Sequence, residues 1–351
     1  MSALVRALVE GARRLQTSGA VTLRPDAAAE PRGQTVLVTG VDRAVGAALA
    51  HDFHARGFAV HGTHQRPGVD AEVPGMRWHV VPRSDDPAYL PTLHRIVQRH
   101  GVSIVVPTLD EELPVMAGVR RWPDPGVLVV VSGPGPVNLA QDKLLACWQL
   151  AGHAVPTPTC ASPSDFPNTH EALDAMGGAT VVRARRAGRT GIGARVVLDP
   201  SELDWDRLDD DFIVQQFVPG QEYLCVLYRP DGPARRGTVV FEVMSPGPRH
   251  EEVRALLPGE AEDVERTAWA AIRALGILGP AEVVVRRAAD NTPLVLSVHP
   301  RFSRHCSQLL DQLSTPETLP RPRTAPEQAR GRARRGGPHD PSRGHGPEPR
   351  S

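Results

Sequence analysis

The chain has 351 residues, and 40% of them are hydrophobic, which is enough for ordinary buried cores and for roughly two to three domains. Forty basic side chains balance 40 acidic ones, so the charge gives no reason to expect binding to nucleic acid or to an anionic membrane surface. The four cysteines form no C-x-x-C pair, which suits a reducing compartment, so we expect a cytoplasmic protein without a zinc knuckle.

Residues 1–33 are expected to form an N-terminal extension. Leu4, Leu8 and Leu15 lie at helical spacing with arginines between them. The apolar run is too short for a signal peptide or a membrane span. We therefore expect a docking helix or a loose extension rather than a membrane anchor.

Residues 34–141 read as a Rossmann-like domain, because apolar strand runs alternate with helical patterns. This alternation predicts a doubly wound parallel sheet with ligands beyond the carboxyl ends of its strands, where Thr39, Gly40 and the acidic residues 110–112 lie. The predicted elements are strand 35–40, helix 45–57, strand 58–64, helix 87–101, strand 103–108 and strand 126–133.

The first strand-to-helix turn, VTGVDRAVGAALA, resembles the opening of a short-chain dehydrogenase. Arg43 occupies the middle glycine position, and Leu139 stands four residues before Lys143 where that chemistry needs a tyrosine. The dehydrogenase reading is therefore rejected. Gly40 and Gly46 are left with two readings, a nucleotide-facing turn or close packing of the helix on its strand.

Lys143 is the only lysine among the 40 basic residues. Lysine is a compact, flexible point charge and arginine a planar fork, so a site that needs the first shape can reject the second. Lys143 also begins an apolar helical pattern that ends at Gly152. Two explanations for this single lysine are open, a phosphate-binding role that requires lysine and chance.

Residues 142–312 change to a mixed α+β pattern, and residues 313–351 to a Pro/Arg/Gly-rich composition that cannot bury enough apolar surface to fold. We expect this tail to be disordered, with weak binding to an acidic partner as the alternative. Its abrupt start fits a natural truncation or a shifted reading frame equally well. The predicted elements before it are strand pairs in 179–199 and 212–228, a helix over 262–276, and a hairpin over 281–300.

From about residue 34 to about residue 310, the order of elements resembles an ATP-grasp protein, specifically the branch of the carbamoyl-phosphate synthase large subunit. The resemblance implies an α/β fold in which a Rossmann-like pre-ATP-grasp domain, 34–141, precedes a two-subdomain α+β ATP-grasp domain, 142–312. VPTLDEELPV is similar to the end of the leading domain, and DKLLACWQLAGHAVPTP to the helix that begins with a phosphate-contacting cation.

The resemblance implies an ATP site. Lys143 and Arg183 would contact phosphates, and backbone N–H groups of a glycine-rich flap would approach them where side chains are absent. Arg183 replaces the lysine of most relatives, and an exposed hairpin turn is the alternative for the flap. FIVQQFVPGQEYLCVLY is similar to the adenine hinge, with Glu222 holding the ribose and Gln216 replacing a glutamate. The remaining residues of this set are Gly188, Gly191, Gly193, Phe217 and Val218.

The family's magnesium-ligand positions are occupied here by Val284, Ser297 and His299. Mg²⁺ prefers oxygen donors, particularly carboxylates, whereas imidazole suits softer metals. Glu282 lies two residues before Val284 and so on the same face of a strand. We therefore expect a divalent metal only if Glu282 joins Ser297 and His299 as a ligand.

Two functions follow from the resemblance. The first is an ATP-dependent ligase that activates a carboxylate as an acyl phosphate and passes it to an amine, with Arg301 holding the acyl phosphate or the carboxylate. The alternative is a degenerate ATP-grasp module that binds nucleotide or a partner without turnover. Expected partners are ATP and a small carboxylate or amine, with no nucleic acid, no membrane, and a homodimer left open.

The paired histidines His51/His54 and His61/His64 are predicted to be structural or at the surface. Each pair lies on its own element and implies no third ligand. The segment containing His299, His305 and Cys306 is a weaker alternative metal cluster.

Overall fold

The computed structural model describes residues 34–66, 75–124, 126–186, 194–232, 236–245 and 252–314. All of them belong to one compact unit that spans Met1–Thr315. The N-terminal extension, the flap glycines and nearly all of the predicted tail lie outside the described residues, so the predictions for them stay predictions.

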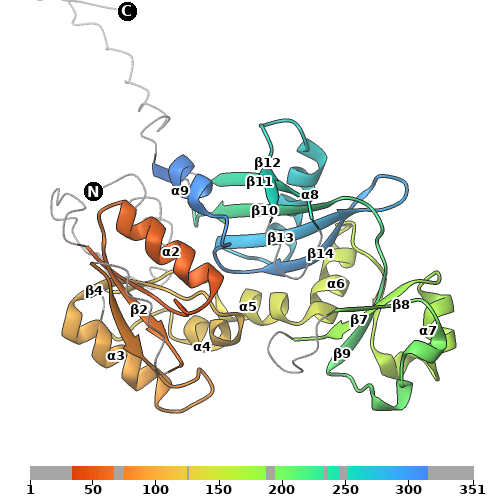
Figure 1. Ribbon diagram of the computed structural model, residues 1–351, viewed down its shortest axis with the longest axis horizontal. Helices are drawn as coiled ribbons and strands as arrows, with labels where there is room; N and C mark the ends of the chain where they lie inside the picture. The colour runs from red at the N-terminus through yellow and green to blue at the C-terminus, as the bar shows by residue number, and fades with distance from the viewer. Residues whose placement is uncertain are drawn as a thin grey trace, which may run out of the picture. The chain divides into compact units, whose positions relative to one another are not determined.

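Five parallel strands in the order β3-β2-β1-β4-β5 form the first sheet, as the alternating pattern predicts (Figure 1). Leu49 of helix α2 packs in the core on one face, with Val36 and Val38, and Leu93 of helix α3 packs with Leu37 on the other. Because side chains alternate along a strand, the two helices cover opposite faces. The bounds are β1 (Thr35–Val38), α2 (Ala44–Ala55), β2 (Ala59–His64), β3 (Arg77–Val80), α3 (Tyr89–His100), β4 (Val102–Val106) and β5 (Leu128–Val129).

The turn between β1 and α2 depends on its glycines for close packing. Gly40 has a φ of 58°, in the left-handed region, and a Cβ added to Gly46 would lie 2.3 Å from the carbonyl oxygen of Gly40. A larger residue at Gly46 would push the helix away from the strand. The packing explanation therefore accounts for these two glycines without a nucleotide.

Two antiparallel sheets follow in the sequence, in agreement with the predicted α+β pattern (Figure 1). The four-stranded sheet has the order β6-β9-β7-β8 and the five-stranded sheet the order β12-β11-β10-β13-β14. Their strands are β6 (Cys160–Ala161), β7 (Thr180–Ala184), β8 (Arg195–Val197), β9 (Phe212–Gln216), β10 (Glu222–Arg229), β11 (Gly237–Val243), β12 (Val253–Ala255), β13 (Gly279–Arg287) and β14 (Pro293–His299).

The remaining helices connect and cover these sheets. Helix α8 packs its Ala268 and Ile272 on the face of β13 that carries Val283 and Val285. No helix in the described ranges has the length and apolar character needed to cross a bilayer. The further helices are η1 (Asp110–Glu112), α4 (Leu113–Gly118), α5 (Pro134–Gln141), α6 (Lys143–Gly152), α7 (Thr169–Ala175), α8 (Glu262–Ala274) and α9 (Ser307–Ser314).

The predicted strands on either side of Pro219-Gly220 are both present, but they belong to different sheets. β9 pairs with β6 and β7, whereas β10 pairs with β11 and β13. A Cβ on Gly220 would lie 2.3 Å from the carbonyl oxygen of Arg287, which accepts a hydrogen bond from the Gly220 N–H at 3.0 Å. The chain thus crosses between the sheets through a closely packed linker.

Candidate functional site

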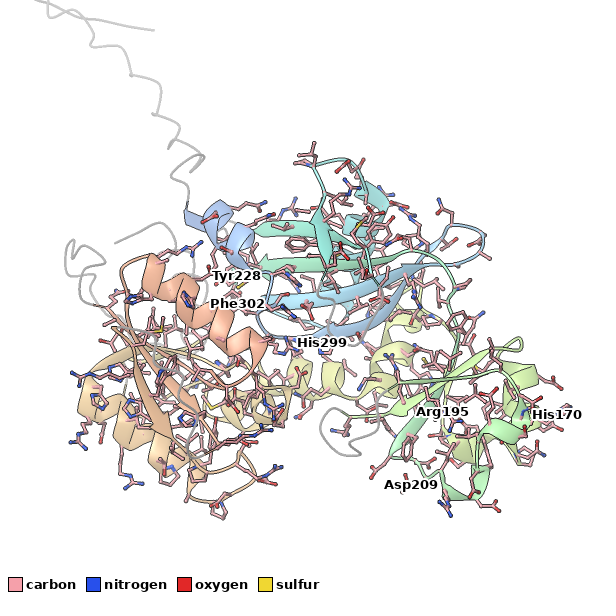
Figure 2. The ribbon with its side chains drawn as sticks, viewed as in Figure 1. His170, Arg195, Asp209, Tyr228, His299 and Phe302 are labelled. Carbon is pink, nitrogen blue, oxygen red and sulfur yellow. The ribbon has the colours of Figure 1, made fainter. Side chains whose placement is uncertain are left out.

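A cluster of opposite charges joins the carboxyl end of β4 to the residues that follow β14. Arg301 donates from Nε and Nη2 to the two carboxylate oxygens of Asp110, at 2.8 and 3.2 Å. His299, the last residue of β14, is labelled in Figure 2. Its Nδ1 lies 3.5 Å from the Asp110 carboxylate. Burial opposes ionisation of Asp110, but the charges of Arg301 and His299 hold its pKa well below the usual range. Asp110 is therefore a charged anchor for both residues.

Glu112 fixes the turn that presents Asp110. Its fully buried carboxylate accepts hydrogen bonds from the backbone N–H groups of Thr108 and Leu109 at 2.8 and 2.9 Å. It also accepts from the hydroxyls of Thr39 and Tyr89. Burial raises the pKa of Glu112, and these hydrogen bonds oppose the rise. The polar ends of β1 and β4 are thus used to hold η1 in place.

The register of β13 and β14 brings the predicted metal positions onto one face. Val284 pairs with Ser297, and Glu282 pairs with His299, with a register shift after Val284. Ser297 Oγ and His299 Nε2 are 3.3 Å apart. The inference that Glu282 shares a face with these positions agrees with this register.

The side chains on this face do not fit Mg²⁺. Glu282 is the one carboxylate among them, and the charges of Arg301 and His299 with a hydrogen bond from Ser303 lower its pKa against the effect of burial. Its negative charge is therefore already compensated by protein cations. Mg²⁺ needs several oxygen donors in near-octahedral geometry, and valine, serine and histidine do not supply them.

Lys143 stands between positive and negative neighbours at the first turn of α6. Its Nζ lies 3.5 Å from the carbonyl oxygen of Arg185. Burial and the charge of Arg183 lower its pKa to about 8, while Asp110 and Asp142 oppose this shift. Lys143 therefore carries its charge at neutral pH but can lose it in mild alkali.

Arg183 and Asp142 are fixed by contacts that the sequence pattern did not reveal. Arg183 donates to the carbonyl oxygen of Leu296 at 2.7 Å, which links β7 of one sheet to β14 of the other. Asp142 is fully buried and accepts from Arg185 Nε at 2.9 Å and from Arg186 Nη2 at 2.9 Å. These ion pairs connect the start of α6 to the residues that follow β7. The predicted glycine-rich flap begins directly after them, outside the described residues.

The predicted adenine and ribose residues lie along the linker between the sheets. Gln216 exchanges hydrogen bonds with Thr159, through its backbone N–H at 2.9 Å and its side-chain oxygen at 3.4 Å. Glu222 pairs in register with Arg286, whose Nε lies 3.5 Å from its carboxylate. The Arg286 guanidinium also lies over the Phe217 ring, 5.9 Å from its centre. The nucleotide roles of these residues stay predictions.

The prediction of an alternative metal cluster at His299, His305 and Cys306 is wrong. His305 contacts the ring of Phe241, and Cys306 lies 3.8 Å from a carboxylate oxygen of Asp52. Among the described residues, the one group of three His, Cys, Asp or Glu side chains arranged to share an ion is elsewhere, at His61, His79 and His100. The expectation that His61 has no third ligand-type partner is therefore also wrong.

A parallel sheet followed by two antiparallel sheets joined by a short linker is the ATP-grasp fold, which solved structures share. An L-amino acid ligase from Bacillus licheniformis superimposes with a TM-score of 0.60 at 18% identity, covering 81% of this chain and 70% of that one. N5-carboxyaminoimidazole synthetase from Staphylococcus aureus, complexed with ADP, gives a TM-score of 0.61 at 13% identity, covering 77% and 71%. Biotin carboxylase from Campylobacter jejuni gives 0.61 at 14% identity, covering 80% and 70%.

Sequence relatives point to the same class. The chain is 26% identical over 192 residues to D-alanine–D-alanine ligase of Delftia acidovorans, and 25% identical over 191 residues to that of Paracidovorax citrulli. Each match covers 48% of this chain and 57% or 56% of the relative, so the chain spans little more than half their length. No family model matches. The chain thus has the ATP-grasp fold, while its place in the carbamoyl-phosphate synthase branch stays a prediction.

Proposed function

We propose that the chain binds ATP and uses it to join a small carboxylate to an amine. The observation that carries the proposal is a set of neighbouring charged side chains in which Asp110 interacts with Arg301 and Lys143, and Lys143 with Arg183. Arg301 donates a hydrogen bond directly to Asp110. Lys143 is attracted electrostatically by Asp110 and repelled by Arg183. A polyphosphate and a developing acyl phosphate both need such positive charge. The ligase names of the sequence relatives support the same chemistry.

The reaction divides into two transfers. A carboxylate oxygen of the substrate attacks the γ-phosphorus of ATP, the bond to the bridging oxygen breaks, and ADP leaves. The amine then attacks the carbonyl carbon of the acyl phosphate, loses a proton, and expels phosphate. Lys143 and Arg183 would hold phosphate oxygens, Glu222 the ribose hydroxyls, and Arg301 the acyl phosphate or the carboxylate. The flap glycines would cover the phosphates.

Arg301 must be partly released from Asp110 for this role. Each of its two hydrogen bonds to Asp110 uses a separate guanidinium nitrogen, while Nη1 donates to the carbonyl oxygen of Phe302 at 3.0 Å. A bound acyl phosphate would compete with Asp110 for the same planar fork. Asp110 therefore acts as a placeholder that keeps Arg301 in position before substrate binds.

A second candidate function is nucleotide binding without turnover. Val284 occupies the first metal-ligand position of the family and offers no donor atom, and protein cations already compensate Glu282. Phosphoryl transfer depends strongly on metal ions that neutralise the transferring group. This candidate keeps Lys143 and Glu222 in their binding roles and removes the chemical step.

Calorimetric titration of the full chain with ATP, in magnesium and again in EDTA, tests both candidates. The proposal expects saturable binding that Lys143→Ala and Glu222→Ala each weaken by at least about tenfold, roughly the loss of one charge-assisted contact. Arg207→Ala is the matched control, since Arg207 is 86% exposed and pairs with Asp204 at the surface. Unchanged affinity in both site variants would remove the site assignment.

Turnover separates the ligase from the binding module. ADP release is followed with a panel of small carboxylates and amines that begins with D-alanine, the substrate in the names of the sequence relatives. Release that needs both a carboxylate and an amine supports the ligase. ATP binding without release across the panel supports the non-catalytic module. A magnesium requirement that Glu282→Gln abolishes would establish Glu282 as a metal ligand.

A further inference from the structure

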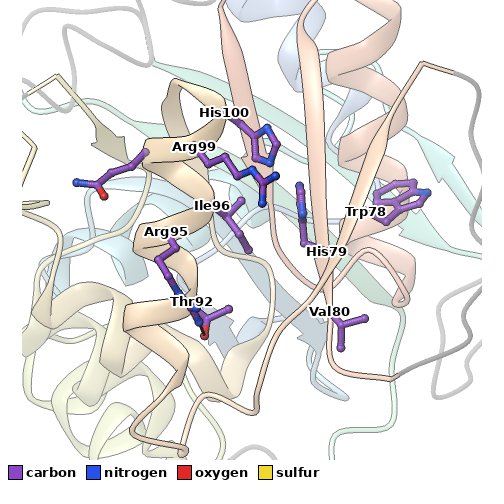
Figure 3. A pocket seen from close by; sticks show the side chains of 9 residues that line it. Trp78, His79, Val80, Thr92, Arg95, Ile96, Arg99 and His100 are labelled. Atoms are coloured by element: carbon purple, nitrogen blue, oxygen red, sulfur yellow. Dashed lines mark hydrogen bonds between the residues drawn. The ribbon is translucent and has the colours of Figure 1, made fainter.

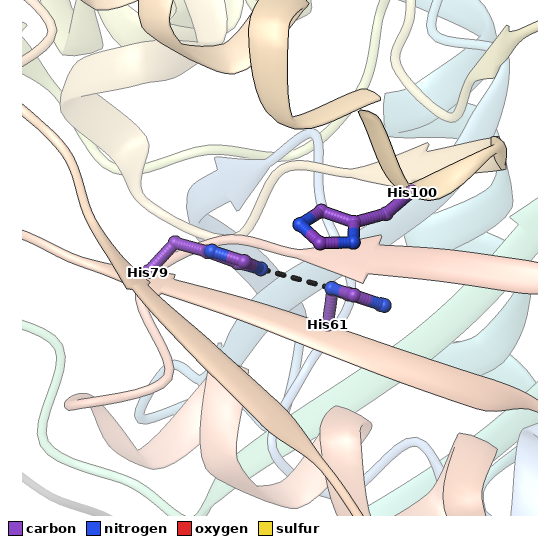
Figure 4. A group of neighbouring side chains, drawn as sticks. All are labelled: His61, His79 and His100. Carbon is purple, nitrogen blue, oxygen red and sulfur yellow. Dashed lines mark hydrogen bonds between the residues drawn. The ribbon is translucent and has the colours of Figure 1, made fainter. Parts of the chain in front are cut away.

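Three histidines from separate elements meet in the parallel sheet. His61 lies on β2, His79 on β3, and His100 is the last residue of α3 (Figure 4). The parallel register pairs Thr63 with His79 and His61 with Arg77, so the rings of His61 and His79 lie on the same face of the sheet. The end of α3 brings the third ring onto that face.

The ring nitrogens are close enough to share one ion. His61 Nδ1 and His79 Nε2 are 2.9 Å apart, and the ligand atoms of all three residues lie within 4.8 Å of one another. In a tetrahedral site with metal–nitrogen bonds of about 2.05 Å, neighbouring nitrogens are about 3.3 Å apart. The observed spacings bracket this value, so small rotations of the rings would complete the geometry.

The surroundings favour the neutral imidazoles of His61 and His79. The charged groups that act on His61 and His79 are Arg77, Arg99 and the other histidines, all positive when charged, and no carboxylate is among them. Burial, then His100, then His79 lower the pKa of His61 to about 4. Burial is also the main cause that lowers the pKa of His79. Neutral imidazole is the form of histidine that binds metal ions.

A simple hydrogen-bonded pair does not account for the cluster. One shared proton explains the contact between His61 and His79, but His100 lies against both rings, with centroid distances of 4.4 and 4.9 Å. The planes of the His61 and His79 rings are nearly parallel, at 3°. Each of the three residues offers one ligand-type nitrogen to the same region, within 4.8 Å of the other two.

The cluster is separate from the candidate ATP site. His100 precedes the first residue of β4, whereas Asp110 follows the carboxyl end of the same strand. The five residues of β4, about 16 Å of strand, separate His100 from Asp110. The charged groups that act on His61 and His79 include no residue of the candidate ATP site. An ion bound by these histidines would therefore not occupy the magnesium position of the candidate ATP site.

We propose that His61, His79 and His100 form a binding site for a divalent transition-metal cation such as Zn²⁺, with the fourth coordination position open to the adjoining groove. Imidazole nitrogens suit Zn²⁺ and related borderline metals, and three protein ligands with one open position is a common zinc arrangement. The groove borders two of the three ligands (Figure 3). It is lined by Trp78, His79, Thr92, Arg95, Arg99 and His100, among others.

The charges around the groove specify the fourth ligand. Histidine ligands carry no negative charge, so both positive charges of the metal stay uncompensated, and Arg95 and Arg99 add further positive charge at the groove. An anion at the fourth position would offset this repulsion. We therefore expect hydroxide, chloride or a small carboxylate to complete the site rather than a neutral group.

Metal titration of the untagged full-length chain, freed of metal with a chelator, tests the proposal. Zn²⁺ is followed by calorimetry, and Co²⁺ by its visible absorption, which distinguishes tetrahedral from octahedral coordination. We expect one strongly bound ion per chain and a tetrahedral cobalt spectrum. Because the loss of an outer-sphere partner already costs 10–100-fold in affinity, His100→Ala should weaken binding by at least about 100-fold.

Controls separate the site from other histidines of the chain. His51→Ala removes an exposed histidine of α2 in the same domain and should leave the affinity unchanged. His339→Ala with His345→Ala removes the tail histidines and should do the same. His100→Gln is the second variant, because His100 lies at a helix end and its replacement leaves the contact between His61 and His79 in place.

The proposal is overturned by any of three results. These are no saturable binding of Zn²⁺ or Co²⁺, equal affinity in the wild-type chain and in folded His100→Ala or His100→Gln, or loss of binding when only the tail histidines are removed. Circular dichroism of each variant shows whether it is folded, so a loss of affinity is not confused with unfolding.

Discussion

The two polar clusters of the described fold use histidine in opposite ways. Beyond the carboxyl end of β4, His299 lies beside Asp110, and Arg301 completes a partly buried set of paired charges. In the second cluster, formed by β2, β3 and the end of α3, His61 meets two further histidines and positive neighbours, and no carboxylate is among the charged groups that act on it. The same side chain is therefore part of a charged network in one place and a neutral lone-pair donor in the other. Its neighbours, and not its residue type, decide what it can bind.

Removing Arg301 should have the largest effect on stability. Arg301→Ala leaves Asp110, whose side chain is 20% exposed, without its main counter-charge, and removal of one partner from a buried pair costs about 3–5 kcal/mol. We expect a loss of this order in urea unfolding. Arg207→Ala breaks an exposed pair and should cost less than about 1 kcal/mol. A loss from Arg301→Ala no greater than from Arg207→Ala would show that the Asp110 network adds little to stability.

Zn²⁺ bound at the histidine cluster should change the free energy of unfolding of the chain by a slightly smaller amount. A ligand that binds only the native state adds about 2.7 kcal/mol at a hundred times its dissociation constant. We expect the free energy of unfolding to rise by about this amount when Zn²⁺ is added to the wild-type chain at that ratio. His100→Ala should show no increase under the same conditions, and an equal increase in both chains would place the ion elsewhere.

Acid should lower the free energy of unfolding in two different pH ranges, because the two clusters titrate at different pH. The pKa of His61 falls from 6.5 to about 4 on folding, so between these values the unfolded chain binds more protons. The contribution of His61 is complete above pH 6.5 and is lost as the pH falls toward 4, by on the order of 1–2 kcal/mol in the metal-free chain.

Asp110 has the same sign of dependence at lower pH. Its pKa is held below the ordinary value of 3.8, so its contribution is complete above that pH and is lost only in stronger acid. Urea unfolding across the range, in wild type, His61→Gln and Asp110→Asn, measures the two ranges separately. A loss between pH 6.5 and 4 that His61→Gln leaves unchanged would contradict the assignment to His61.

The smallest expected effect is on nucleotide affinity in mild alkali. Lys143 has its pKa lowered to about 8 by burial and by Arg183, so it loses its charge as the pH rises through that value. ATP should bind up to about tenfold more weakly at pH 9 than at pH 7, roughly 1.4 kcal/mol. Lys143→Arg keeps a charge across this range and should flatten the profile. An identical profile in the variant would exclude Lys143 as its cause.

Periodicity and turn residues are sufficient to predict most helices and strands, and to predict that an alternating α/β segment precedes a mixed α+β segment. The strand runs of residues 35–64 form β1 and β2, and the hairpin with Asp290-Asn291 at its turn joins β13 to β14. Short or weakly periodic elements such as β12 and α9 were not predicted. Two residues spaced by two along one strand share a face, which is why Glu282 was correctly placed beside Val284.

The sequence by itself determined the class of fold and the position of Lys143 at the start of a helix, because both depend on residues close together in the chain. Only the tertiary structure paired Arg301 with Asp110 across 191 residues and brought His61 to His79 and His100. Such contacts depend on strand order, on register and on where a helix ends over a sheet. Periodicity carries none of these, so the charge network and the histidine cluster appeared only with the fold.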